Sequence, residues 1–229
     1  MSFSELKLDA KQKLKGKYGE AIIMMLVFGA ISFVAGQFDV ALNKALGTVA
    51  ENGQGTLSIF VTLATIVFGL GIVSFYLKIS RGESPKWKEL YSKTNRIPDY
   101  FVLTLLMGIF IFLWALLLII PGIIASISYS MAQYIMLDEP DLSPMECIRK
   151  SKEMMKGHKW EYFCLGLSFI GWIILGIFTF GILYLWLMPY MSVTMCNFYN
   201  KLKGDKVTSK KPKLVQKEEK AYFFFFFII

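Results

Sequence analysis

The chain carries little charge for its length. Of 229 residues only 18% are Asp, Glu, Lys or Arg, whereas 55% are hydrophobic and the mean hydropathy is +0.50. An ordinary soluble domain has about 25% charged residues, so this composition indicates a membrane protein. Because about six spans of roughly 20 residues would use about half the chain, little room remains for a separate catalytic domain of normal size.

Cysteine and histidine are also scarce. The three cysteines, Cys147, Cys164 and Cys196, show no CxxC spacing, so neither a disulfide framework nor a zinc site is predicted. His158 is the only histidine, and one imidazole alone forms neither a metal site nor a catalytic dyad. We therefore expect no metal, no cofactor and no enzyme activity.

Long uncharged runs predict an all-α, polytopic membrane fold. At a rise of about 1.5 Å per residue, most of these runs are long enough to cross roughly 30 Å of hydrocarbon. The six predicted spans are 21–38, 57–77, 101–120, 122–137, 162–180 and 182–200. They form one predicted domain, 1–202, followed by a lysine-rich tail, 203–229, that ends in a run of phenylalanines.

The stretch 101–137 admits two readings, a single helix kinked at Pro121 or two spans joined by a tight hairpin at Pro121–Gly122. A single helix would be about 55 Å long, which exceeds the bilayer. The basic residues favour the hairpin, because it places every lysine and arginine except Lys44 on one side of the membrane. Positive loops stay in the cytoplasm, so six spans with both termini cytoplasmic are expected.

Short sequence matches predict an internal repeat. Lys11, Lys15 and Gly16 match Lys152, Lys156 and Gly157 at a constant offset, and 99–105 lines up with 161–167. These matches predict three hairpins, each preceded by an amphipathic helix at the cytoplasmic interface. Similarity by chance among apolar hairpins is the alternative.

The interfacial helix is best defined over 143–159. Ser143 and Glu146 form a predicted capping box, with Pro144 at the first helical position. Its amphipathic pattern is typical of a helix that lies on a membrane, although a helix packed on protein gives the same pattern. The residues expected at the anionic inner leaflet are Arg149, Lys150, Lys152, Lys156, Lys159 and Trp160.

The spans themselves carry no Asp, Glu, Lys, Arg or His side chain, and ion-coupled transport and intramembrane hydrolysis normally require such groups. The carboxylates Glu20, Asp99 and Glu161 lie at inner span ends, where the helix dipole favours a negative charge. If a pocket or hinge exists, the serine-rich fourth span and two prolines are the expected place. These residues are Pro121, Ser126, Ser130, Gln133, Tyr134 and Pro189.

Six segments carry a family resemblance: Ile120-Pro121-Gly122-Ile123-Ile124, Tyr129-Ser130-Met131, Ser151-Lys152, Met155-Lys156-Gly157-His158-Lys159-Trp160, Leu167-Ser168-Phe169-Ile170-Gly171-Trp172 and Leu187-Met188-Pro189-Tyr190. Together they resemble an uncharacterised bacterial integral membrane family, domain of unknown function number 975, over roughly residues 4–202. The resemblance implies a multi-span protein of the bacterial cytoplasmic membrane without an established activity. It implies no catalytic residue.

Three functions remain open. The first is a non-enzymatic membrane protein that acts through contacts with lipids or a protein partner, as an accessory, scaffold or envelope-stress component; nucleic acid is not an expected partner. The second is a transporter or channel for an uncharged or amphipathic solute. The third is an enzyme acting on lipid headgroups, in which Asp99, Glu161 and His158 would converge. The terminal phenylalanines are interpreted either as a small membrane anchor or as translated terminator sequence.

Overall fold

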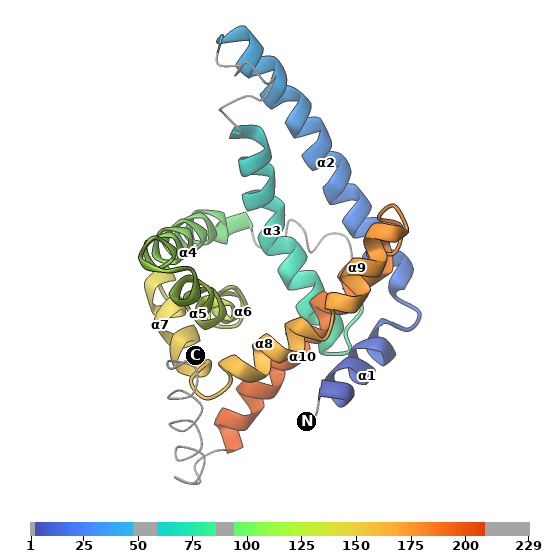
Figure 1. The fold of residues 1–229 in the computed structure, drawn as a ribbon, viewed down its shortest axis with the longest axis vertical. Coiled ribbons are helices and arrows are strands. Elements are labelled where there is room, and N and C mark those ends of the chain that lie inside the picture. Colours follow the sequence, from blue (N-terminus) through green and yellow to red (C-terminus); the bar gives the residue numbers. More distant parts are fainter. Residues whose placement is uncertain (1–2, 48–58, 86–93, 209–229) are drawn as a thin grey trace.

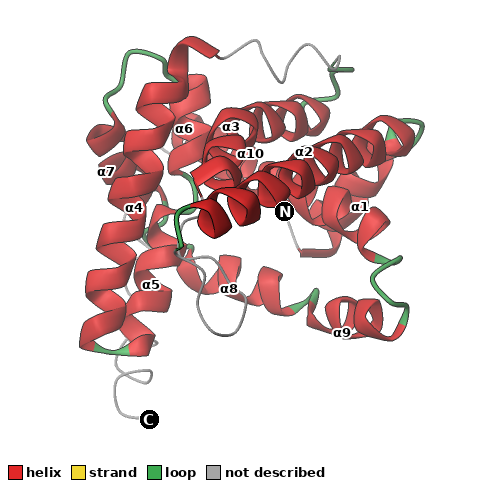
Figure 2. Ribbon diagram, turned by 90° about the horizontal axis from the view of Figure 1, so that it is seen from above, coloured by secondary structure: helices red, strands yellow, loops and turns green. Residues whose placement is uncertain are grey.

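The computed structural model describes residues 3–47, 59–85 and 94–208, in which helices, turns and short connections occur but no strand (Figure 2). The all-α prediction is confirmed for this part of the chain. The tail from 209 and most of the predicted interfacial segment before the third span lie outside the described residues. The elements are α1 (Phe3–Leu14), α2 (Tyr18–Ala45), α3 (Ile59–Ser80), the 3-10 turn η2 (Thr94–Arg96), α4 (Ile97–Leu117), α5 (Ile119–Tyr129), α6 (Ala132–Asp138), α7 (Pro144–Met154), α8 (Lys159–Leu167), α9 (Ile170–Phe178) and α10 (Tyr184–Thr208).

Four helices of the described residues are long and apolar enough to cross a membrane. They are α2, α4, α5 continued by α6 (Ile119–Asp138), and α8 continued by α9 (Lys159–Phe178). In α3 the apolar part is shorter, Phe68–Ser80, and α10 ends in polar residues that include Asn197, Asn200 and Lys201. These helices suit a membrane protein, and the count of six crossings stays a prediction.

The turn between α4 and α5 lies earlier than the sequence predicts. The extended residue is Leu118, with φ −162° and ψ 148°, and Pro121 already belongs to the first turn of α5. Proline fits there because the first amides of a helix have no intrahelical acceptor. The prediction of a turn at Pro121–Gly122 is therefore wrong by about one helical turn.

Gly122 lets α4 and α5 approach closely just after this turn. A Cβ atom added at Gly122 would lie 2.8 Å from the Cβ of Ala115 and 2.9 Å from its Cα. Real side chains do not approach a neighbouring backbone so closely, because cores are already packed to the density of crystals. The packing of α4 against α5 therefore requires glycine at position 122. The two helices run side by side in Figure 2.

Two short helices, α1 and α7, pack against the longer ones in the same manner. Every fourth residue is fully buried in each helix: Leu6, Ala10 and Leu14 in α1, and Cys147, Ser151 and Met155 at and beyond α7. α1 lies on α10, and α7 lies on α4, α5 and α6 (Figure 1). The apolar side of α7, expected to rest on lipid, is thus covered by protein.

A glycine follows each of these helices and turns the chain into the next long helix. Gly16 has φ 79° and Gly157 has φ 84°, a left-handed conformation that costs other residues energy. The two glycines are the pair that the sequence matches align. Both glycines therefore have the same backbone conformation, as the predicted repeat requires, but the repeat itself stays a prediction.

Candidate functional site

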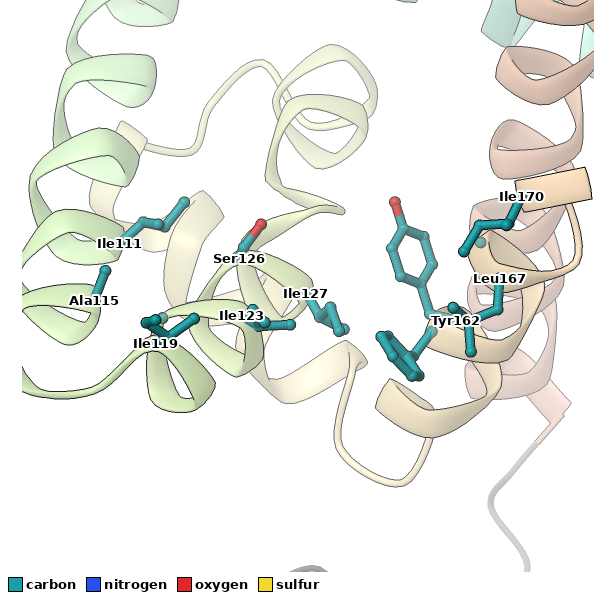
Figure 3. A pocket seen from close by; sticks show the side chains of 12 residues that line it. Ile111, Ala115, Ile119, Ile123, Ser126, Ile127, Tyr162, Leu167 and Ile170 are labelled. Carbon is teal, nitrogen blue, oxygen red and sulfur yellow. The ribbon is translucent and has the colours of Figure 1, made fainter. Parts of the chain in front are cut away.

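An apolar groove lies between the α4–α5 pair and α8. Its volume is about 480 Å³, which lies within the roughly 300–1,000 Å³ of small-molecule sites. Figure 3 shows its two walls, with the labelled side chains of α4 and α5 facing those of α8 and the start of α9. The lining residues are Ile111, Ala115, Ile119, Gly122, Ile123, Ser126, Ile127, Tyr162, Phe163, Gly166, Leu167 and Ile170.

Only two of these lining side chains carry a polar atom, the hydroxyl groups of Ser126 and Tyr162. No charged residue belongs to the lining set. Gly166 leaves space on the α8 wall, because an added Cβ there would have no neighbour within 4 Å. The groove therefore suits an apolar or amphipathic chain and offers nothing that would stabilise an ion.

The structure separates the residues predicted to form a pocket or hinge. Ser126 lines the groove, whereas the Ser130 hydroxyl donates 2.8 Å to the carbonyl of Ile127 in its own helix turn. Tyr134 stacks on Tyr199 with ring centroids 5.2 Å apart. Gln133 is half-buried, Pro121 is in the first turn of α5, and Pro189 is buried inside an uninterrupted α10.

The predicted fourth span is broken at Ser130–Met131, and α7 supplies the missing backbone partners. The Ser151 hydroxyl donates 2.8 Å to the carbonyl of Ser128 and accepts 3.1 Å from the amide of Met131. Ser151 is fully buried. One hydroxyl group thus satisfies two backbone groups that the break leaves without a helical partner.

The predicted fifth span is broken too, between α8 and α9. At this break the ammonium group of Lys7 donates 3.2 Å to the carbonyl of Ser168 and lies 4.2 Å from the centroid of the Phe169 ring. Burial lowers the pKa of Lys7 from its usual value. The sequence did not predict that Lys7 and Ser151 bind at these helix breaks, because their hydrogen-bond partners are distant in the chain.

A carboxylate at the end of α6 joins three helices. Asp138 accepts 2.6 Å from Arg81 Nη2, 2.6 Å from Lys203 Nζ and 2.9 Å from the hydroxyl of Tyr199. Its side chain is only 6% exposed. Asn200 extends the cluster by donating 2.8 Å to Ser80 Oγ. The cluster ties the ends of α3, α6 and α10 together by charge-assisted hydrogen bonds.

The basic residues predicted at the lipid interface lie along α7 and the start of α8. Arg149, Lys152, Lys156 and Trp160 are exposed, the last to 61%. Lys150 forms an ion pair with Glu139, and Lys159 is half-buried as the first residue of α8. The predicted capping box is confirmed, since Ser143 Oγ accepts from the amide of Glu146 and the Glu146 carboxylate accepts from the amide of Ser143.

The three predicted dipole carboxylates occupy the first turns of their helices: Glu20 in α2, Asp99 in α4 and Glu161 in α8. Of the three residues expected to converge in a headgroup enzyme, His158 and Glu161 are in contact, at 3.1 Å. Asp99 pairs with Arg96 at 3.2 Å, whereas Glu161 binds Lys201 and His158. Among the described residues no group of three His, Cys, Asp or Glu side chains could hold a metal ion, and all three cysteines are free.

Comparison with known families agrees with the resemblance seen in the sequence. The family described as protein of unknown function (DUF975) matches residues 1–125 and 115–206. The chain belongs to this family. No curated protein and no solved structure matches this DUF975 protein.

Proposed function

We propose that this DUF975 protein is a non-enzymatic protein of the bacterial cytoplasmic membrane that acts by binding a bilayer lipid through its α4–α5/α8 groove. In the proposed topology it has six spans and cytoplasmic termini, and the lipid contact serves an accessory, scaffold or envelope-stress role. The groove is the observation that carries the proposal. Its walls belong to helices that are long and apolar enough to be surrounded by acyl chains.

The residues that line the groove suit binding of an acyl chain better than catalysis. Ser126 and Tyr162 are its only polar side chains, so the lining itself supplies no carboxylate or imidazole for general acid–base chemistry. An acyl chain makes van der Waals contact with the isoleucines and leucines on both walls. The same lining supports lipid contact better than headgroup chemistry.

The proposal is tested with a phospholipid that carries a photoactivatable diazirine in its acyl chain. The protein is reconstituted in nanodiscs and irradiated, and lipid adducts are mapped by peptide mass spectrometry. We expect adducts on Ile123 and Leu167 in excess over Phe33, which is 68% exposed on α2. Equal labelling of groove and α2 residues would show ordinary annular lipid and overturn the proposal.

Two glycine variants make the test specific. Gly166→Phe places a ring in the groove, whereas Gly29→Phe adds the same ring on α2, where an added Cβ also has no neighbour within 4 Å. The groove adducts should fall several-fold in Gly166→Phe and stay unchanged in Gly29→Phe. Unchanged adducts in both variants would count against a chain bound in the groove.

A transporter or channel for an uncharged or amphipathic solute is the second candidate. The observation that favours it is the pair of helix breaks, at Ser130–Met131 and at Ser168–Phe169, one in each wall-forming span. Broken helices commonly line transport pathways. Release of a trapped amphipathic dye from proteoliposomes, blocked by Gly166→Phe and not by Gly29→Phe, would favour transport over a resident lipid.

A further inference from the structure

An acyl chain alone gives the groove little means of choosing among bilayer lipids. All lipid tails are about as apolar as leucine, so a chain that leaves the bilayer for the groove gains packing but no hydrophobic free energy. Selection between lipids therefore depends on what lies at the ends of the groove. The end near Tyr162 lies close to the start of α8, because this helix begins three residues earlier, at Lys159.

The first residue of α8 continues the wall of the groove. Lys159 precedes Tyr162 by three residues and Phe163 by four, and residues at these spacings share one face of a helix. Lys159 thus lies one turn beyond the groove lining. Lys156, in the turn that leads into α8, is exposed.

The acidic residue of this turn, Glu161, is held by other basic side chains. Glu161 already accepts hydrogen bonds from Lys201 and from His158 Nδ1, the latter at 3.1 Å. The N-terminal end of the α8 dipole adds partial positive charge at the same place. Trp160 is 61% exposed beside it, and tryptophan is enriched at the level of lipid headgroups.

We propose that the groove binds an anionic phospholipid, with one acyl chain between α5 and α8 and the headgroup phosphate beside Lys156 and Lys159. The inference rests on the proposed function, since it adds a headgroup to the chain assigned there. Its support is the continuity of an uncharged groove with a positively charged end on the same helix face. In such a site the lysines select an anionic headgroup, and the groove binds the acyl chain.

The test compares two lipids in one membrane. Nanodiscs contain equal amounts of phosphatidylglycerol and phosphatidylcholine, and the diazirine acyl chain is placed on one lipid in the first sample and on the other in the second. In the wild-type chain we expect phosphatidylglycerol to give about tenfold more groove adducts, because each lysine near an anionic headgroup favours it severalfold. This ratio tests the inference without any variant.

A matched pair of double variants locates the selectivity. Lys156→Gln/Lys159→Gln removes the two charges at the start of α8 and in the turn before it, whereas Lys11→Gln/Lys15→Gln removes two exposed charges from α1 and the turn after it. The first should bring the adduct ratio close to one, and the second should leave it near tenfold. The same ratio in both variants would overturn the assignment of the headgroup to Lys156 and Lys159.

The outcomes also separate this inference from the proposed function. Groove adducts from both lipids in equal amounts would disprove the anionic headgroup site and leave the lipid-binding groove intact. Groove adducts from neither lipid would contradict the proposed function itself. Loss of the ratio in Gly166→Phe alongside a retained fold would link both parts to one bound lipid.

Discussion

Ser151 on α7 and Ser128 on α5 are joined by a 2.8 Å hydrogen bond in which the Ser151 hydroxyl donates to the Ser128 carbonyl. The same hydroxyl accepts 3.1 Å from the amide of Met131. This pair of bonds explains why α7 is packed on protein rather than laid on lipid: it completes a broken helix. The basic side of α7, with Arg149 and Lys152, remains exposed.

The first prediction concerns this bridge. Ser151→Ala leaves a buried carbonyl and a buried amide without partners, which should cost about 1–3 kcal/mol of unfolding free energy. Hydrogen exchange of amides 131–135 should become faster. Thr104→Ala is the control, since the Thr104 hydroxyl donates to the carbonyls of Tyr100 and Phe101 within its own helix, away from the break. Equal effects of the two substitutions would show that the bridge does not hold the break.

The second prediction uses two glycines of the α4–α5 pair. Gly122→Ala forces a Cβ into Ala115 and should destabilise the protein by about 1–3 kcal/mol. Gly108→Ala, in the middle of α4, has no neighbour within 4 Å of the new atom and should be neutral or stabilising by up to about 1 kcal/mol. Thermal unfolding in detergent measures both. A neutral Gly122→Ala would contradict the close approach of the two helices.

The third prediction concerns the cluster around Asp138. Asp138→Asn removes the negative charge from between Arg81 and Lys203, so we expect a loss of about 2–3 kcal/mol. Asp141→Asn, an exposed acid three residues away, is the control and should change stability by less than about 0.5 kcal/mol. Similar stabilities of the two variants would mean that the cluster does not tie α3, α6 and α10 together.

The fourth prediction is a pH dependence at the start of α7. The hydroxyl and the amide of Ser143 hydrogen-bond to the Glu146 carboxylate and hold its pKa below the usual value. A lowered pKa in the folded state means that the capping box stabilises α7 at neutral pH and loses this effect as the pH falls through that pKa. Ser143→Ala should raise the pKa of Glu146, as measured by carboxyl carbon NMR. An unchanged pKa would contradict the capping geometry.

The sequence predicted the local features of this fold well because their causes are local. The capping box needs only residues 143–146, and Glu20, Asp99 and Glu161 reach first turns because each precedes an apolar run. The predicted position of the turn before α5 was wrong, because a proline is found both where one helix ends and in the first turn of the next. The backbone at Leu118 decides between them.

The features that define the candidate site depend on contacts between distant segments. Asp138 meets Arg81 and Lys203 across 57 and 65 residues. One signal was present: all three charged residues follow the inner end of a predicted span, which favours a meeting at the same membrane level. The groove has no comparable signal, since it depends on how α8 is spaced from the α4–α5 pair.

The lipid site at Lys159 requires a protein that crosses the membrane six times and presents its basic ends to the cytoplasm. Reporter fusions measure this topology, with alkaline phosphatase active only outside and green fluorescent protein fluorescent only inside. Fusions after Ala50 should read external, and fusions after Lys93, Lys152 and Lys203 should read cytoplasmic. A cytoplasmic result at Ala50 or an external one at Lys152 would disprove the six-span topology.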